Sequence, residues 1–227
     1  MAESSIFIIN GQCPLFCVNE NNYHRFFYGT TLLVSNSSIT FATIMIHFHT
    51  LRSTDDQHWS SFVDTYTSSF PLDEQRPTGS IAQLLTSEER FTAMVLLDKN
   101  NSFVGILTTW TFDTFIYIEH FALHPALRSQ GYGSIALQTF IQHNTLPIIL
   151  EVEPPTDTLT QRRVSFYERC GLRLYDYPYI QPPYTPELSE VSLRLMGTLP
   201  QETPLTTVAE LLHREVYGVS LPSLPAQ

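Results

Sequence analysis

Two glycines and an arginine stand close together in the run from Arg128 to Ser134. A strand-like stretch at residues 115–123 precedes this run, and a helix-like stretch follows it. The first backbone N–H groups of a helix have no partner within the helix, and the helix dipole makes this end positive. Glycines at the same point let phosphate oxygens come close to the main chain. The run is therefore typical of a pyrophosphate site that needs no buried cationic side chain.

The elements that would hold this run in place are strands interspersed with helices. Apolar or alternating runs predict strands, and apolar residues spaced three and four apart predict amphipathic helices. Strands are expected at residues 46–51, 92–97, 103–109, 115–123, 147–152, 172–177 and 191–196, and helices at about 59–70, 80–85, 133–143, 160–170 and 208–216. Ser53 to Asp56 would cap the first helix, and Gly171 would end the fourth. The last two strands would form an antiparallel pair.

The composition of the 227-residue chain limits its partners. Twelve basic and twenty-two acidic residues give a net charge of -10, which argues against a nucleic-acid binder and favours cationic ligands such as amines. No apolar stretch reaches the roughly 20 residues of a membrane span, and the N-terminus lacks the basic start of a signal peptide. We therefore expect a cytoplasmic protein without nucleic-acid or membrane partners.

The cysteines and histidines indicate neither a disulfide framework nor a metal centre. Cys13, Cys17 and Cys170 are few and odd in number. His47 and His49 would share one face of a strand, but no obvious further ligand accompanies them. No metal site is expected.

The first 44 residues differ in composition from the rest of the chain. Their charged residues are Glu3, Glu20 and Arg25, and they contain strand-like patches but no sustained amphipathic period. We expect residues 1–44 to be a poorly ordered extension, or a mis-assigned start with translation beginning at Met45. Residues 45–218 would form the main domain and residues 219–227 a tail.

Two motifs together resemble the GNAT family of acyl-CoA-dependent N-acetyltransferases. They are Phe121-Ala122-Leu123-His124-Pro125 running into Arg128-x-x-Gly131-x-Gly133, and Phe166-Tyr167-Glu168-Arg169-Cys170-Gly171-Leu172. They occur in the family's order, and the resemblance covers residues 45–218. It implies an α/β fold of the α+β type, with a mixed, mostly antiparallel central sheet flanked by helices. This sheet would be splayed between its fourth strand, Glu119 to Leu123, and its fifth strand, Ile148 to Val152.

The resemblance also implies that acetyl-CoA is the acyl donor. Its pantetheine arm would insert between the two splayed strands and pair with the backbone of Phe121 and Leu123. The pyrophosphate would bind to the N–H groups of Gln130, Gly131, Tyr132, Gly133 and Ser134, with Arg128 adding positive charge at the mouth.

Acetyl transfer to an amine needs a base and an acid rather than a protein nucleophile. Glu119, just upstream of the pantetheine-binding positions, is the expected base, with a strand-edge ion pair or hydrogen bond as its alternative use. His120 would face the opposite side of the strand and is the weaker candidate. Tyr167, four residues before Gly171, resembles the family's acid, which protonates the departing thiolate; the alternative is packing on the helix face.

Glu151 and Glu153 alternate with Val152 and would face one side of the fifth strand. They could bind a cationic amine or supply an alternative base, or one of them could pair with Arg162 or Arg163. The tyrosine-rich segment that follows could line the acceptor pocket or simply pack against the sheet.

We therefore predict an acyltransferase that moves an acetyl group from acetyl-CoA to a primary amine by direct attack in a ternary complex. The acceptor would be a small molecule or a peptide, and the protein a monomer or homodimer. A non-catalytic acyl-CoA-binding regulatory module is the alternative. The presence of both Glu119 and Tyr167 favours chemistry.

Overall fold

The computed structural model describes residues 15–17, 25–27 and 44–219. The chain divides into two units, Met1–Met45 and Ile46–Gln227. In the first unit, β1 (Leu15–Cys17) pairs antiparallel with β2 (Arg25–Phe27), a pairing that the sequence did not predict. The strand-like patches predicted in residues 1–44 lie outside the described residues. The proposed extension, domain and tail boundaries stay predictions.

The second unit is built on a seven-stranded mixed sheet with the order β3-β4-β5-β6-β7-β9-β8. Its strands are β3 (His47–Thr50), β4 (Phe91–Leu97), β5 (Phe103–Thr111), β6 (Ile116–Leu123), β7 (Ile148–Val152), β8 (Arg173–Gln181) and β9 (Val191–Gly197). Only β6 and β7 pair in parallel; the other neighbouring strands of this sheet are antiparallel. The predicted fold class and the antiparallel pairing of the last two strands are confirmed.

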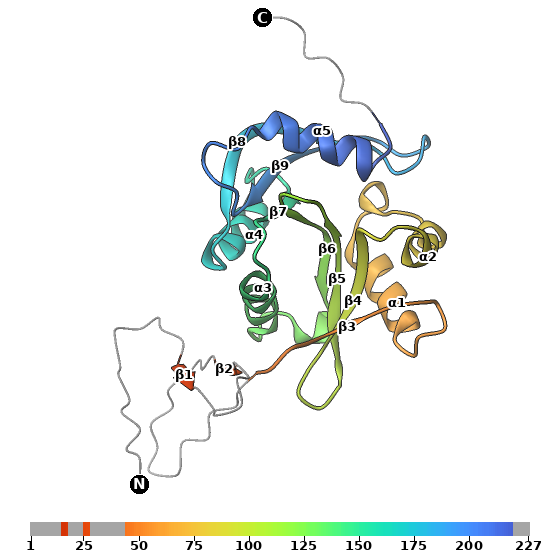
Figure 1. Ribbon diagram of the computed structural model, residues 1–227, viewed down its shortest axis with the longest axis vertical. Helices are drawn as coiled ribbons and strands as arrows, with labels where there is room; N and C mark the ends of the chain where they lie inside the picture. The colour runs from red at the N-terminus through yellow and green to blue at the C-terminus, as the bar shows by residue number, and fades with distance from the viewer. Residues whose placement is uncertain (1–14, 18–24, 28–43, 220–227) are drawn as a thin grey trace, which may run out of the picture. The chain divides into compact units, whose positions relative to one another are not determined.

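Five α-helices flank this sheet in the described part of the chain. They are α1 (Trp59–Ser69), α2 (Thr78–Ser87), α3 (Tyr132–His143), α4 (Thr158–Arg169) and α5 (Leu205–Glu215), and two 3-10 turns, η1 (Leu72–Glu74) and η2 (Pro125–Leu127), lie between them. Figure 1 shows α1 and α2 on one side of the sheet and α3 and α4 on the other.

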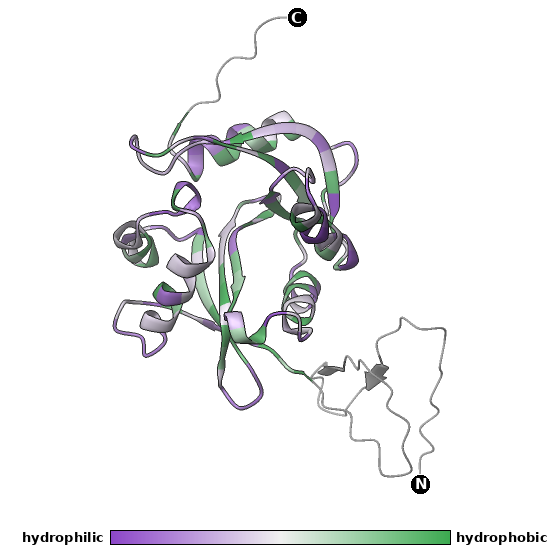
Figure 2. Ribbon diagram, turned by 180° about the vertical axis from the view of Figure 1, so that it is seen from behind, coloured by the Kyte–Doolittle hydropathy of each residue, from purple (hydrophilic) through white to green (hydrophobic). Residues whose placement is uncertain are grey.

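Apolar burial holds these layers together. The central strands are largely apolar (Figure 2), and nearly every residue of β4 and β5 is buried, as expected for strands that are covered on both faces. One core cluster joins α1, α2 and α5 to the sheet; it includes Phe62, Tyr66, Ile81, Val208, Leu212, Val95, Ile106, Tyr117 and Leu195. On the other side, α3 buries Ile135, Leu137 and Phe140.

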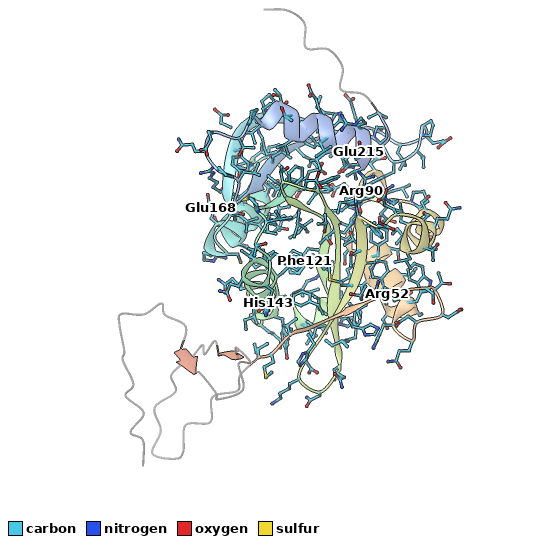
Figure 3. All side chains as sticks on the ribbon, in the orientation of Figure 1. Arg52, Arg90, Phe121, His143, Glu168 and Glu215 are labelled. Atoms are coloured by element: carbon cyan, nitrogen blue, oxygen red, sulfur yellow. The ribbon has the colours of Figure 1, made fainter. Side chains whose placement is uncertain are left out.

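An ion-pair cluster at the start of β4 ties the ends of two distant elements together. Arg90 pairs with Glu88 at 2.9 Å and with Glu215 of α5 at 2.8 Å. Figure 3 shows Arg90 and Glu215 close to one another near the end of α5. None of the three residues of this cluster lines the cavity between β6 and β7.

The predicted elements of this unit are present, with ends that differ by a few residues. Helix α1 begins only at Trp59 and has no side-chain cap; Asp56 instead accepts a hydrogen bond from the N–H of His58 (2.9 Å) in the preceding turn. Strand β8 continues to Gln181, because a register shift before Pro178 accommodates a residue that cannot donate to the ladder. The predicted end of α4 is confirmed.

The pairing between β6 and β7 is short. It consists of Ile116 with Ile148, Tyr117 with Ile149 and Ile118 with Leu150, and then stops. Beyond these residues the two strands no longer pair, which confirms the predicted splay. The second half of β6 therefore has an unpaired backbone edge facing β7.

Candidate active site

A cavity of about 750 Å³ lies where β6 and β7 separate. Its wall comes from the second halves of β6, β7 and α4, the start of α3, the segment between α1 and α2, and the end of β8 with its following loop. The predicted site residues in this wall are Glu119, Phe121, Leu123, Arg128, Gly131, Gly133, Ser134, Glu151, Glu153 and Tyr167. Gln130 and Tyr132 lie beside it without lining it. Both predicted motifs thus meet at one cavity.

Helix α3 begins at a turn in which Gly131 has a φ of 88°. Glycine adopts this left-handed backbone without steric cost. Among the residues that the structure describes, none accepts a hydrogen bond from the N–H groups of residues 130–134, whereas the N–H of Ile135 bonds to the carbonyl of Gly131. Free N–H groups at the positive end of a helix bind anions. The start of α3 therefore has the free N–H groups that the sequence predicted, and the binding of a pyrophosphate to them stays a prediction.

Gly133 and Arg128 shape the approach to this helix start. A Cβ on Gly133 would lie 3.3 Å from Cδ1 of Leu123 and 3.5 Å from Cζ of Phe166, so α3 packs closely against β6 and α4. The exposed Arg128 donates hydrogen bonds to the carbonyl of Leu123 (3.2 Å) and to the hydroxyl of Ser69 (3.1 Å). Its charge is held at the mouth of the cavity.

Glu119 occupies a β-bulge in β6. Thr108 pairs with His120 and Thr109 pairs with Ile118, so Glu119 has no partner on β5. The expectation that His120 would face away from Glu119 is therefore wrong, because strict alternation requires a regular ladder. Instead, Nδ1 of His120 lies 3.8 Å from Oε2 of Glu119. Both side chains turn to the α1 side of the sheet.

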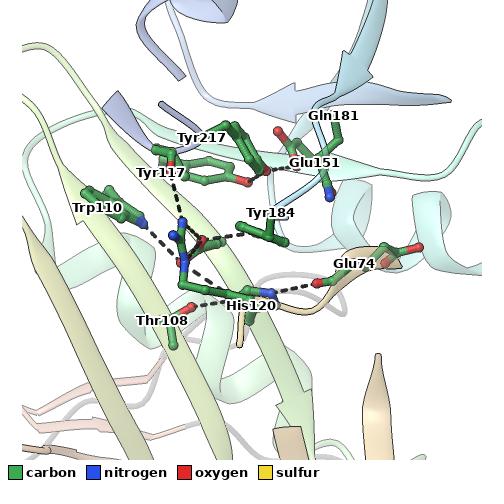
Figure 4. A network of polar contacts seen from close by, with 12 residues as sticks. Glu74, Thr108, Trp110, Tyr117, His120, Glu151, Gln181, Tyr184 and Tyr217 are labelled. Atoms are coloured by element: carbon green, nitrogen blue, oxygen red, sulfur yellow. Dashed lines mark hydrogen bonds and ion pairs between the residues drawn. The ribbon is translucent and has the colours of Figure 1, made fainter. Parts of the chain in front are cut away.

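The carboxylate of Glu119 is buried and fully hydrogen-bonded, and Figure 4 labels two of its donors, Trp110 and Tyr184. Its Oε1 accepts hydrogen bonds from Nη2 of Arg76 (2.7 Å), Nε of Arg76 (3.1 Å) and the hydroxyl of Tyr184 (3.0 Å), and its Oε2 accepts one from Nε1 of Trp110 (3.0 Å). Burial alone would raise the pKa of Glu119, but the charge and hydrogen bonds of Arg76 hold it below its ordinary value. Glu119 thus forms an ion pair, which was the alternative use expected from the sequence.

Glu151 of β7 has a different environment, made of tyrosines. Its Oε2 accepts a hydrogen bond from the hydroxyl of Tyr217 (2.9 Å), which in turn contacts the hydroxyl of Tyr117 (3.0 Å). Among the described residues, the buried Oε1 of Glu151 has no hydrogen-bond partner. Burial raises the pKa of Glu151 to about 7, although the tyrosine hydroxyls around it act in the opposite direction. This carboxyl can gain and lose a proton near neutral pH.

The raised pKa of Glu151 has a consequence for stability. Between pH 4.5 and about 7 the folded chain keeps a proton on Glu151 that the unfolded chain has lost, so this group makes folding less favourable as the pH rises. The cost above pH 7 is on the order of 3 kcal/mol. We expect Glu151→Gln to raise the melting temperature at pH 8 and to change it little at pH 4. A gain of equal size at both pH values would contradict this, and calorimetry at the two pH values tests it.

Glu153 forms an ion pair with Arg163 of α4, one of the two arginines predicted as its partner. The same arginine lies near Glu74 of η1, another residue of the wall. Burial raises the pKa of Glu74 and the charge of Arg163 opposes that change. The cavity thus carries several carboxyl groups, of which Glu119 and Glu153 are neutralised by arginine.

Several residues of the wall were not assigned to the site from the sequence, among them Glu74, Gln181 and Tyr184. Tyr184 belongs to the tyrosine-rich segment, for which pocket lining was one of two possibilities. The positions of these three residues depend on long-range contacts, such as the bond from Nε2 of Gln181 to the carbonyl of Asp73 (3.4 Å). In the sequence, only the high tyrosine content of residues 175–184 indicated that this segment could line a pocket.

Tyr167 lies in the last turn of α4 and lines the cavity. The helix ends through Gly171, which has a φ of 95°, and the carbonyl of Tyr167 accepts a hydrogen bond from the N–H of Leu172 (3.2 Å). The tyrosine hydroxyl has no hydrogen-bond partner among the described residues. Burial raises the pKa of Tyr167 to about 12, so the phenol keeps its proton at neutral pH.

Other candidate groups do not form a second site. Burial raises the pKa of the Cys170 thiol to about 11, which leaves little reactive thiolate at neutral pH. His49 bonds to Asp56 at 2.7 Å. In residues 15–17, 25–27 and 44–219, no three His, Cys, Asp or Glu side chains could together hold a metal ion, and no helix is long and apolar enough to cross a bilayer.

Comparison with known proteins identifies the family. Residues 56–172, which include α1 to α4 and most of the cavity wall, match the sequence profile of the acetyltransferase (GNAT) family. The chain belongs to the GNAT family of acetyltransferases. A solved structure from Bacteroides thetaiotaomicron, assigned to the same GNAT family, is 33% identical; the match covers 77% of this chain and 99% of that one, with a TM-score of 0.73.

Two further relatives show how far the GNAT similarity extends. YjbC of Bacillus subtilis (strain 168), assigned as an acetyltransferase, is 32% identical over 102 residues, which are 44% of this chain and 50% of YjbC. The chain thus spans about half the length of this curated relative. Spermidine N-acetyltransferase of Vibrio cholerae, solved with CoA and spermine, is 11% identical, with 68% of this chain and 95% of that chain covered and a TM-score of 0.51. That similarity shows the GNAT fold alone.

Proposed function

We propose that this protein transfers an acetyl group from acetyl-CoA to a primary amine by direct attack in a ternary complex. The observation that carries the proposal is the cavity between β6 and β7, which joins a free strand edge to the free N–H groups at the start of α3. GNAT proteins use acetyl-CoA or CoA, and a thiol ester with a long arm and a pyrophosphate fits this arrangement.

The residues of this chain fit the acyl donor. The backbone of Phe121 and Leu123 lies on the part of β6 that does not pair with β7, where it can bond to a pantetheine amide. The carbonyl of Leu123 already accepts one hydrogen bond, from Nε of Arg128. The start of α3 supplies N–H groups for the pyrophosphate, and Arg128 adds a cation at the mouth. Acetyl-CoA supplies the acetyl group as a thioester, which an amine nitrogen can attack.

Of the three carboxylates considered as the base, Glu119, Glu151 and Glu153, we favour Glu151. Glu153 is paired with Arg163. Glu119 is committed to Arg76 and two further donors, and its lowered pKa makes it a weak proton acceptor. Glu151 has one oxygen without a partner among the described residues and a pKa of about 7, near the value at which a base works best in neutral solution. Glu119 therefore serves better as a structural anchor.

Two residues carry the proton transfers in this proposal. Glu151 takes the proton that an ammonium must lose before its nitrogen can bond to the acetyl carbon. Tyr167 gives its hydroxyl proton to the sulfur as the carbon–sulfur bond breaks. The nitrogen loses its second proton as the amide forms, and this proton, passed through solvent, replaces the one that Tyr167 gave to the sulfur. Glu151 releases its proton to solvent, so neither residue is consumed.

The acceptor in this proposal is a cationic primary amine, either small or part of a peptide. Carboxyl groups of Glu74, Glu151 and Glu153 line the cavity, Glu153 in an ion pair with Arg163, and the whole chain has a net charge of -10. Such surroundings raise the local concentration of cations. Glu151 and Glu153 are the proposed contacts for the ammonium group.

Release of CoA from acetyl-CoA by the full chain tests this function. A panel of polyamines, amino sugars, amino acids and lysine-containing peptides should contain at least one amine that accelerates the release and becomes acetylated, as judged by mass spectrometry. Tight acetyl-CoA binding in calorimetry without amine-dependent release would instead favour the regulatory alternative.

The acetyl-CoA site makes a separate prediction at Gly131. Valine at this position must adopt a φ of 88°, which is strained for a side chain branched at Cβ, and the start of α3 should distort. We expect Gly131→Val to weaken acetyl-CoA binding by about tenfold or more in calorimetry, which corresponds to roughly 1.4 kcal/mol. Gly79→Ala in α2 is the matched control, because a Cβ there meets nothing within 4 Å. Equal affinities of both variants would refute the anion site.

A further inference from the structure

Residues from both faces of the sheet line the cavity, and the two sets differ. On the α3 side lie Leu123, which contacts the start of α3, and Tyr167 of α4. On the α1 side lie Glu119 and His120, turned there by the bulge. If the acyl donor occupies the α3 side, as the proposed function requires, the acceptor must enter from the α1 side.

The segment 70–77 between α1 and α2 forms part of the acceptor-side wall through Phe70, Pro71 and Glu74. It contains only one short 3-10 turn, so it depends on contacts with the rest of the fold. Several of these contacts are made by one residue, Arg76, at the end of the segment.

The side chain of Arg76 is 12% exposed and donates hydrogen bonds to two different residues. It binds Glu119 through Nη2 and Nε, and Nη2 also donates to the carbonyl of Val216 (2.9 Å). Its guanidinium lies over the ring of Tyr184, 4.6 Å from the centroid, and 5.6 Å from that of Trp110. One side chain thus joins the segment to β6, β5, the loop after β8 and the end of α5.

The backbone of the segment is held as well. The N–H of Arg76 donates to the hydroxyl of Tyr66 (2.6 Å), which itself donates to the carbonyl of Arg76 (3.2 Å). Nε2 of His120 bonds to the carbonyl of Glu74 (3.1 Å). Figure 4 shows this contact between His120 and Glu74 beside the bulge.

The same contacts reach the proposed base. Tyr184 donates to Glu119, and its ring lies 5.1 Å from the ring of Tyr217, whose hydroxyl donates to Glu151. The ring of Tyr217 beside Glu151 therefore packs on Tyr184, whose position depends on the carboxylate of Glu119. Arg76 holds that carboxylate in place. Removing one partner of a buried ion pair leaves an uncompensated charge and disturbs its surroundings.

We propose that Arg76 is a positioning residue of the acceptor site: through its ion pair with Glu119 it fixes the segment 70–77 and Tyr184 as the acceptor-side wall. Acceptor binding then depends on Arg76, whereas acetyl-CoA binding does not. The assignment of the wall to the acceptor rests on the proposed function. The anchoring itself can be tested without any activity.

Hydrogen exchange on the full-length Arg76→Met variant tests the anchoring. We expect exchange in residues 70–77 to accelerate about tenfold or more, because the buried bonds to Glu119 are lost. Arg90→Met is the matched control, since Arg90 also joins distant parts of the chain through ion pairs, with Glu88 (2.9 Å) and Glu215 (2.8 Å), but does not line the cavity. Unchanged exchange in residues 70–77, or the same acceleration in Arg90→Met, overturns the proposal.

Kinetics then test the role in the acceptor site. Arg76→Met should raise the KM for the amine about tenfold and leave the KM for acetyl-CoA within about twofold. Equal increases in both constants overturn the proposal even if the segment exchanges faster. If Arg76→Met does not fold, Arg76→Lys keeps the charge without the two-nitrogen contact to Glu119 and should show the same pattern at smaller size. Faster exchange without acetylation of any amine would contradict the proposed function but not the anchoring.

Discussion

Replacement of Glu151 by glutamine is expected to lower kcat by about 10² to 10⁴-fold, the usual contribution of a general base. Glutamine has nearly the same shape and can still accept the hydrogen bond from Tyr217, but it cannot take a proton from the acceptor. The KM for acetyl-CoA should stay within about twofold, because the donor site is formed by β6 and α3. Steady-state rates of CoA release, measured with a saturating amine, give both constants.

The pH dependence distinguishes a lost base from a damaged site. In the unaltered protein Glu151 is protonated and inactive below its pKa of about 7, so kcat/KM should rise as the pH passes through this value. Glu151→Gln should lose this rise and keep only a low rate.

Glu119→Gln is the matched comparison for this test. It replaces a carboxylate whose lowered pKa places its titration well below 7, so the rise near pH 7 should persist in that variant whatever its rate. An unchanged rise in Glu151→Gln, lost in Glu119→Gln, would return the base assignment to Glu119.

The central sheet and its splay could be predicted because their signals are local or belong to a motif. Gly131 and Gly171 have the left-handed backbone that a tight turn or helix end needs, and each stands where the sequence predicted a helix boundary. Together with the order of strands and helices, they located the start of α3 and the end of α4. Most of the predicted donor-site positions line the cavity for this reason.

The surroundings of the carboxylates could not be predicted in the same way. The bulge at Glu119 has no signature in the sequence, and it reverses the side to which His120 points. Arg76 lies 43 residues from Glu119 and 140 from Val216, so their contacts depend on the assembled fold. Glu151 lines the cavity, but alternation along β7 carried no information on which carboxylate would be neutralised.

Replacement of Tyr167 by phenylalanine is expected to lower kcat about 100-fold, with the KM for acetyl-CoA changed less than about twofold. The ring would still fill its part of the wall, and only the hydroxyl would be lost. Because burial raises the pKa of Tyr167 to about 12, the phenol keeps its proton across the assay range, so the deficit should not depend on pH between 6 and 9. Tyr177→Phe, which removes a hydroxyl from β8 outside the cavity wall, should be nearly neutral.

The acid role can be separated from simple packing by changing the leaving group. When the acetyl group is carried by a more acidic thiol, the sulfur leaves as a thiolate with little help from a proton donor. The negative charge of that thiolate is already stabilised. The deficit of Tyr167→Phe should therefore shrink with such a donor, compared at a saturating concentration with the unaltered protein. A deficit of equal size for both donors would mean that Tyr167 positions the thioester rather than protonating the sulfur, and the departing group would then receive its proton from solvent.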